Sequence, residues 1–288
     1  IAAKKATGLP LFVHIHATEF DRAGGHFGNP LVREIEYVGL HMADHIFAVS
    51  GRTKQTLIDE YGIPPEKITV AENVMNISPV LIAEEHDSYP YLEAMRRIGY
   101  KVLVNAGRMT IQKGIMQLLE AARLVVDKIP KRLFLLAGGG EQIPELQMKA
   151  AALGLSGNVM FTGRIEGIGK QWRDSFRVAD LFVMPSVSEP LGLVPYEAIA
   201  YGAPAMISKQ SGIAEVLTNV LKVDYWDTHE MANQMLAVLG NQDLHDTLLA
   251  NARAEHERLS WAPIAKRMYD RYHCTLNRYG RRLLESHV

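Results

Sequence analysis

The sequence predicts an α/β protein with two parallel sheets, and two observations support this fold class. Short apolar runs typical of buried strands alternate with longer segments whose apolar residues recur at helical spacing. The alternation is interrupted once, between Met75 and Tyr100, where prolines and acidic residues replace it. Because alternating strands and helices favour a parallel sheet, we expect one doubly wound unit on each side of this interruption.

The first series of strands has three members. They are expected at residues 11–15, 45–50 and 67–71. Helices are expected at residues 30–43, with Pro30 near the start, and at residues 51–61, which Gly62 ends. Three strands form a narrow sheet with an exposed edge, so this unit is expected to be truncated and could self-associate.

The second series of strands is longer and suffices for a complete doubly wound sheet. Its strands are expected at residues 101–106, 133–137, 158–161, 181–184, 205–207 and 221–224. A helix at 113–128 has apolar residues at helical spacing, and the chain is mostly helical after residue 227. We therefore expect a partial first domain at 1–95, a second domain at 96–262, and a final helix at 263–288 that crosses back to the first.

The composition argues against several functional classes. The 288 residues are 48% hydrophobic and 22% charged, as in ordinary globular proteins. A net charge of −1 provides no broad positive field for nucleic acid, and no apolar run approaches the ~20 residues of a membrane span. The single cysteine, Cys274, excludes an internal disulfide and favours a reducing, cytoplasmic location.

Segment 189–202 is the most informative part of the sequence, because it places Glu189 and Glu197 eight positions apart. It follows the apolar run at 181–184, which predicts a strand, a loop and a helix. In open α/β sheets ligands bind at the carboxyl ends of strands, and the N–H groups opening a helix can hold a phosphate. Glu189 would stand beside that anion site, and Glu197 could accept hydrogen bonds from a sugar diol. The combination suggests a nucleotide-sugar site.

Two cations follow the first strand of the second series. Arg108 and Lys113 lie in the loop 107–114, which also belongs to the carboxyl edge of the sheet. A diphosphate leaving group gains negative charge as its bond to sugar breaks, and two fixed cations can stabilise it without a metal. The alternative is a pair of solvated surface charges.

Glycines 138–140 follow the next strand and would let a ligand approach the backbone closely, although a flexible turn explains them equally well. The run does not continue as a dinucleotide fingerprint, because Ile143 occupies the last glycine position. After the following strand, backbone groups near Arg164 and Ile165 could bind a base edge. The alternative there is an ordinary loop.

His14 and His16 are two residues apart in the first expected strand, so their rings point to the same side. Glu19 and Asp21 follow in the loop, and a metal site is conceivable. Structural histidines at a strand edge are a second interpretation. A third places His16 at a cleft, touching a sugar.

Together, the motifs at 107–114, 138–140, 161–165 and 189–202 resemble retaining glycosyltransferases of family 4, which include bacterial glycogen synthase-like enzymes. The resemblance covers nearly the whole chain. It implies a GT-B fold with two Rossmann-like domains. It also implies transfer of a hexose, expected to be glucose, from a UDP-, ADP- or GDP-sugar to a glycan or other hydroxyl acceptor. It implies retention at the anomeric carbon and no metal or other cofactor.

The resemblance also implies roles for individual residues. Arg108 and Lys113 would hold the diphosphate, and Glu197 the ribose hydroxyls. Glu189 and the backbone of Gly192 and Leu193 would contact the donor sugar and phosphate. The remaining implied contacts are Gly139 against the donor, Arg164 and Ile165 beside the base, and His16 on the acceptor side.

This sequence departs from the family pattern at two places. Family members usually have a further strand and a Gly-rich loop before the point where this chain starts, and they often have glycine where Val74 stands. An alternative is therefore a non-catalytic fragment that binds nucleotide sugar and needs a separate amino-terminal half. Another is a different GT-B enzyme, such as a sugar-nucleotide epimerase or a phosphorylase, although no lysine is a convincing pyridoxal site.

Overall fold

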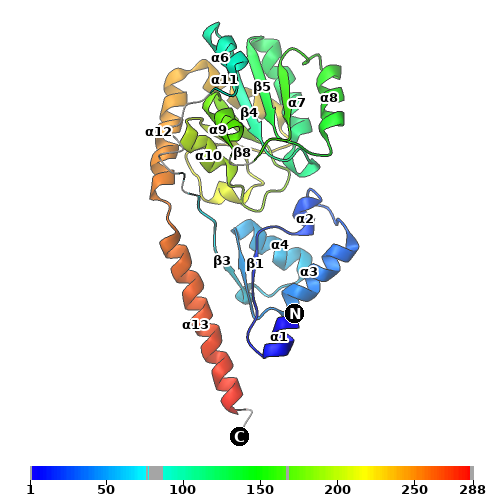
Figure 1. Ribbon diagram of the computed structural model, residues 1–288, viewed down its shortest axis with the longest axis vertical. Coiled ribbons are helices and arrows are strands. Elements are labelled where there is room, and N and C mark those ends of the chain that lie inside the picture. The colour runs from blue at the N-terminus through cyan, green and yellow to red at the C-terminus, as the bar shows by residue number, and fades with distance from the viewer. Residues whose placement is uncertain (1, 76, 78–86, 167–168, 286–288) are drawn as a thin grey trace. The chain divides into compact units, whose positions relative to one another are not determined.

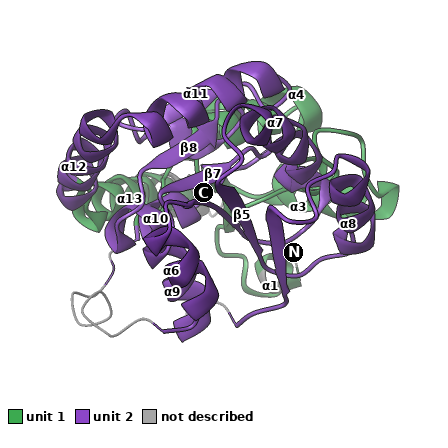
Figure 2. Cartoon of the chain, turned by 90° about the horizontal axis from the view of Figure 1, so that it is seen from above, with its two compact units in different colours: residues 1–74, 259–288 green, residues 75–258 purple. Residues whose placement is uncertain are grey.

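Figure 1 shows the computed structural model, which describes residues 2–75, 77, 87–166 and 169–285. The chain forms two compact units. The first unit comprises residues 1–74 and 259–288, and the second unit comprises residues 75–258 (Figure 2). The second domain was expected at residues 96–262, so the observed second unit begins and ends earlier along the chain.

The second unit contains a six-stranded parallel sheet in the order β6-β5-β4-β7-β8-β9. The strands are β4 (Lys101–Ala106), β5 (Arg132–Ala137), β6 (Val159–Gly163), β7 (Leu181–Met184), β8 (Ala205–Ser208) and β9 (Leu221–Val223). All six expected strands are confirmed. The strand order reverses between β4 and β7, and such a switch point is where open α/β sheets bind ligands.

Helices cover both faces of this sheet (Figure 2). One face carries α7 (Ile115–Lys128), α8 (Ile143–Ala152) and α11 (Thr228–Gly240), and the other α6 (Pro90–Arg97), α9 (Lys170–Arg177) and α10 (Val194–Tyr201). α12 (Gln242–Arg258) packs against α10 and α11. The apolar positions expected on α7 are buried in the main core, as Leu118 and Leu119 illustrate.

The stretch between the two strand series contains a helix, α6, that the sequence pattern did not predict. Ser88 and Tyr89 fasten its start to α9, because the Ser88 N–H donates to Asp174 Oδ2 at 3.1 Å and the Tyr89 hydroxyl donates to the Gln171 carbonyl at 3.1 Å. These bonds explain why residues before 95 belong to the second unit. Residues 78–86, which include Pro79, Glu84 and Glu85, lie outside the described residues.

The first unit contains a three-stranded parallel sheet, β1-β2-β3. Its elements are α1 (Ala2–Thr7), β1 (Phe12–Ile15), α2 (Glu19–Arg22), α3 (Pro30–Met42), β2 (His45–Ala48), α4 (Gly51–Tyr61), η1 (Pro65–Lys67), β3 (Ile68–Val70) and α13 (Trp261–Glu285). One sheet face packs on α3 and α4 through Leu40, Ile46 and Leu57. On the other face, Tyr272 of α13 lies edge-on to Phe12 (4.6 Å) and Phe47 (5.4 Å).

Helix α13 is thus the expected late helix, and it belongs to the first unit together with residues 1–74. None of the described helices is both long enough and apolar enough to cross a membrane.

Candidate functional site

The loops after β4 and β7 meet at the switch point of the second sheet. Gln112, in η2 (Ile111–Lys113), is buried; its side-chain amide donates to the Ser188 carbonyl at 2.8 Å, and its own carbonyl accepts from the Val187 N–H at 2.8 Å. These two bonds fix the loops side by side. Lys113 and Glu189, predicted separately from the sequence, are therefore adjacent, and their side chains form an ion pair.

Glu189 is held by its backbone as well as its side chain. Its N–H donates to the Gln210 carbonyl at 3.1 Å, and its carbonyl accepts from the Gly212 N–H at 2.9 Å, which ties it to the loop after β8. The Ser186 hydroxyl donates to the carboxylate at 3.2 Å, and the residue is only 8% exposed. The carboxylate is thus held in place, and its Oε2 is the atom that pairs with Lys113.

The two cations differ in how their charge is used. The Lys113 ammonium is balanced by Glu189, so an incoming diphosphate would compete with that carboxylate for it. Arg108 is exposed and makes no ion pair within the described parts of the chain. Its guanidinium is therefore the readier of the two to receive a new anion.

A cavity of about 510 Å³ opens at the carboxyl ends of β4, β5 and β6. Its walls are Gly107, Arg108, Gly138, Gly139, Gly140, Arg164, Ile165 and Trp172. Four residues predicted from separate motifs, Arg108, Gly139, Arg164 and Ile165, therefore line one cavity. Its volume lies within the range typical of small-molecule sites.

The glycine run after β5 has a structural reason that the sequence left open. A Cβ at Gly138 would lie 1.9 Å from the Gly107 carbonyl oxygen, and one at Gly140 would lie 2.2 Å from the Met109 carbonyl oxygen. These glycines let the loops after β4 and β5 pack backbone to backbone. They shape the wall of the cavity, whether or not a ligand also approaches them.

Glu197 lies on α10 and is half-buried. The indole N–H of Trp172, on α9, donates to its Oε1 at 2.8 Å. Burial raises the pKa of the Glu197 carboxyl, and the Trp172 hydrogen bond opposes that rise. Trp172 lines the cavity, and the sequence did not reveal it, because no motif surrounds it.

The start of α10 lacks a side-chain cap among the described residues. Gly192 adopts a φ of +90°, and Leu193 is the N-cap residue of the helix. Pro195 has no N–H and the Tyr196 N–H donates to the Leu193 carbonyl at 3.0 Å, so the phosphate cradle predicted for Gly192 and Leu193 stays a prediction.

The histidine pair lies in the first unit. The His14 ring nitrogen Nε2 is 3.2 Å from the Ala71 carbonyl, and the His16 Nδ1 is 3.0 Å from the Asn73 side-chain amide. The two rings are 4.4 Å apart, and burial, together with the neighbouring His16, lowers the pKa of His14. The role of His16 beside an acceptor stays a prediction.

The carboxylates of the conceivable metal site are engaged in local structure. Glu19 Oε1 accepts from the Asn29 N–H at 2.9 Å, and Asp21 Oδ2 accepts from the Thr18 N–H at 2.9 Å in the capping box of α2. Both therefore shape the loop after β1.

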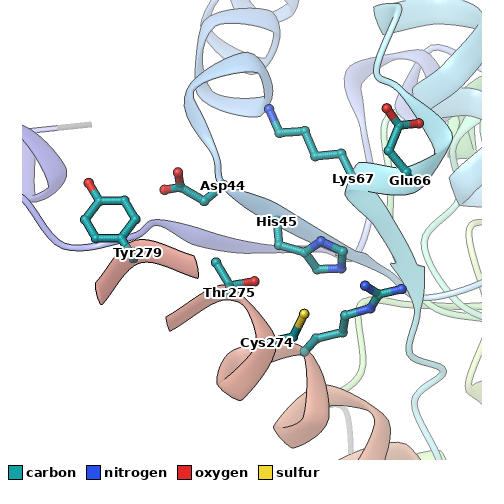
Figure 3. Close-up of a pocket in the computed structure, with 8 residues that line it drawn as sticks. Asp44, His45, Glu66, Lys67, Cys274, Thr275 and Tyr279 are labelled. Atoms are coloured by element: carbon teal, nitrogen blue, oxygen red, sulfur yellow. The ribbon is translucent and has the colours of Figure 1, made fainter. Parts of the chain in front are cut away.

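A second cavity, of about 210 Å³, lies at the amino ends of β2 and β3 (Figure 3). His45, Lys67 and Cys274 are among the residues that line it. Lys67 Nζ donates to the Leu40 and His41 carbonyls at 2.9 and 2.7 Å, and Asp44 pairs with Lys4 at 2.7 Å. These charged groups hold the end of α3 in place, which favours a structural role for the residues that line this cavity.

Comparison with known families places these geometries in context. The model of the family described as glycosyl transferases group 1 matches residues 95–255, more than half of the chain. The chain belongs to this family. A second model, described as glycosyltransferase family 4, matches residues 1–78. The resemblance stated from the motifs is confirmed.

Curated relatives match most of the chain. An uncharacterised glycosyltransferase of Methanocaldococcus jannaschii is 28% identical over 95% of this chain and 71% of its own length. A D-inositol 3-phosphate glycosyltransferase of Thermobispora bispora is 28% identical over 97% and 68%, respectively. A mannosylfructose-phosphate synthase of Agrobacterium fabrum is 25% identical over 81% of this chain and 53% of the relative.

Solved structures confirm the GT-B fold. The Anabaena protein HepE, in complex with UDP and glucose, has a TM-score of 0.76 at 21% identity, covering 95% of this chain and 74% of that one. A sucrose-phosphate synthase of Thermosynechococcus elongatus has a TM-score of 0.75 at 20% identity, with coverage of 96% and 70%.

Proposed function

We propose that this chain is a retaining hexosyltransferase that takes glucose from a nucleoside diphosphate donor. The observation that carries the proposal is the Lys113–Glu189 ion pair at the switch point, together with the cavity that Arg108 of the same loop lines. This arrangement offers cations for a diphosphate beside a cavity large enough for a nucleoside. A structure of the Anabaena neighbour in complex with UDP-glucose supports the choice of donor.

The donor contacts follow from the chemistry of each group. Arg108 and Lys113 hold the diphosphate with the N–H groups of Gly192 and Leu193, while Glu189 contacts the sugar. The base lies between Gly139, Arg164 and Ile165, and Glu197 accepts hydrogen bonds from the ribose hydroxyls. As the leaving group gains negative charge, the interaction of the Lys113 ammonium shifts from Glu189 towards the leaving group. This interaction stabilises the transition state more than the ground state.

In the proposed reaction the bond between the sugar anomeric carbon and the diphosphate oxygen breaks. The acceptor hydroxyl oxygen forms the new bond on the same face of the sugar, so the configuration is retained. The acceptor proton goes to the departing phosphate oxygen, which balances the step. His16 lines the acceptor side, and the acceptor is a glycan or another hydroxyl compound.

Since Arg108 and Lys113 supply the positive charge, we propose that transfer needs no metal ion and no other cofactor. We also propose a cytoplasmic location, which the presence of Cys274 as the single cysteine in the printed sequence favours.

The first experiment is a thermal-shift titration with UDP-, ADP- and GDP-glucose in the presence of a chelator. A ligand that binds the folded state raises the melting temperature, so a shift with one nucleotide supports the donor site and identifies the base. Turnover with candidate acceptors, followed by NMR of the product anomer, then tests retention. An inverted product would contradict the mechanism.

Two other results of the same series would replace the proposal. Binding without turnover, restored by a separate amino-terminal half, would indicate a nucleotide-sugar-binding fragment. Release of an altered nucleotide sugar in the absence of any acceptor would indicate an epimerase.

A further inference from the structure

Trp172 stands between the cavity of the second unit and Glu197. Its ring forms part of the cavity wall beside Arg164 and Ile165, and its indole N–H is bonded to Glu197 Oε1 at 2.8 Å. A single side chain on α9 therefore contacts both the open cavity and a carboxylate on α10.

The ring of Trp172 is held by a row of aromatic side chains. It lies edge-on to Phe176 at 5.5 Å, and the buried Phe176 ring stacks parallel to Tyr201 of α10 at 6.2 Å. Phe176 also packs against Phe182 of β7 at 5.8 Å. Because the row ties α9 to α10 and to the sheet, the indole N–H has a fixed direction toward Glu197.

Glu197 has an unusual environment for a half-buried carboxylate. Its Oε1 accepts from a neutral indole, and in the part of the chain that the structure describes its Oε2 has no hydrogen-bond or ion-pair partner. Taking a carboxylate out of water without a cation is costly, and further donors would offset that cost. A ligand that brings two hydroxyl donors fits this need.

We propose that Trp172 is a positioning residue, whose indole N–H orients Glu197 so that the free carboxylate oxygen selects nucleotides with a ribose diol. The inference rests on the proposed donor site and deepens it. Trp172 acts in two ways: its N–H fixes one carboxylate oxygen, and its ring walls the cavity in which the nucleoside lies. The class of ligand selected is a ribonucleoside diphosphate rather than its dideoxy analogue.

The test compares UDP with 2′,3′-dideoxy-UDP by calorimetry, on the wild type and on Trp172→Phe. If another base is preferred in the thermal-shift series, the corresponding pair of nucleotides is used. Phenylalanine keeps an aromatic wall but removes the N–H. Trp172→Phe is expected to weaken UDP binding about tenfold, the size of one hydrogen bond to a charged group, and to leave dideoxy-UDP binding nearly unchanged.

A matched control is Trp226→Phe, the same substitution at a tryptophan that is 60% exposed in the same unit. It is expected to leave both affinities unchanged. In a Glu197→Gln background, Trp172→Phe is expected to have little further effect on UDP binding, because both changes break one pathway.

Equal weakening of UDP and dideoxy-UDP by Trp172→Phe would show that the ring matters and the N–H does not, which overturns the proposal. If Trp172→Phe does not fold, the wild type still decides, since equal affinity for the two nucleotides overturns diol selection. Failure of the wild type to bind any nucleoside diphosphate would instead overturn the donor site itself.

Discussion

The two sheets of this protein differ in how many of their strands are buried, and the candidate donor site lies at the sheet with more buried strands. In the second sheet β5, β7 and β8 are buried along their whole length, and every residue of the edge strand β6 is partly exposed. In the first sheet β2 is equally buried, whereas every residue of β1 is partly exposed. Strand number alone accounts for this, since a three-stranded sheet has one interior strand.

The difference also appears in the loops that follow the strands. In the second sheet, reversal of the strand order brings the loops after β4 and β7 together, and glycines allow the loops after β4 and β5 to touch. In the first sheet the strands run in simple order, β1-β2-β3, and the loop after β1 is organised by its own caps. The candidate site therefore depends on the strand order and on close backbone packing, and four predictions test this dependence.

The largest effect is expected from glycine substitutions. Gly138→Ala in the second unit would place a Cβ 1.9 Å from a carbonyl oxygen at a φ of +141°. We expect a loss of at least ~3 kcal/mol in unfolding free energy and loss of donor binding. Gly62→Ala in the first unit is the control, because its φ is also positive (+64°, in the left-handed helical region) but nothing lies within 4 Å of the added Cβ.

The control should cost about 1–2 kcal/mol, the penalty for a Cβ in a left-handed conformation. Chemical denaturation of both variants measures the difference. Equal costs would show that the loops after β4 and β5 can separate without harm, and the close packing would lose its importance for the site.

The next effect is expected on catalysis. Lys113→Ala removes the cation paired with Glu189 and should lower kcat/KM. The expected loss of transition-state stabilisation is ~2–4 kcal/mol. Lys149→Ala is the matched control, because the Lys149 ammonium forms an ion pair with Glu120 (2.8 Å) and neither residue lines the cavity. This variant should change kcat/KM by an amount equivalent to less than ~1 kcal/mol. Initial rates with saturating acceptor measure both. If Lys113→Ala lowered the melting temperature while kcat/KM stayed constant, the ion pair would be structural.

The contrast between the two units also explains what could be read from the sequence. Strands such as β4 and β7 coincide with their expected bounds, because a short apolar run between polar loops is a strong local signal. Helix α6 was missed, since its eight residues offer only two turns of pattern and Pro90 suggests a turn rather than a helix start.

The site was predictable residue by residue but not as a set of contacts. Lys113 and Glu189 each stand in a recognisable motif, yet their pairing joins positions 76 apart and depends on β4 and β7 being neighbours. The Trp172 bond to Glu197 depends likewise on how α9 packs against α10. Such contacts arise from tertiary packing, which a local pattern does not encode.

A smaller effect is expected in backbone dynamics. Amide hydrogen exchange in β1 should be faster than in β4 by about tenfold or more, equivalent to ~1.4 kcal/mol in opening free energy, because every residue of β1 is partly exposed whereas β4 is mostly buried. Exchange followed by mass spectrometry on peptides covering residues 12–15 and 101–106 measures this. The peptide at 45–48 is the internal control and should resemble β4, since β2 is fully buried. Equal exchange across all three strands would mean that the two units open together.

The smallest effect, and the one that links stability to the site, concerns Glu197. Burial raises the pKa of this carboxyl above its unfolded value, so the ionised form disfavours folding above the unfolded pKa, and stability is regained as the pH falls through the folded pKa. Glu197→Gln removes the charge but still accepts a hydrogen bond from Trp172. The variant should therefore melt slightly higher than the wild type at neutral pH, and the two should converge in acid. It should also bind UDP more weakly, which distinguishes a carboxylate kept for a ligand from one kept for the fold. A lower melting temperature at neutral pH would mean that the charge stabilises the second unit, and the ligand-based account of Glu197 would lose its physical basis.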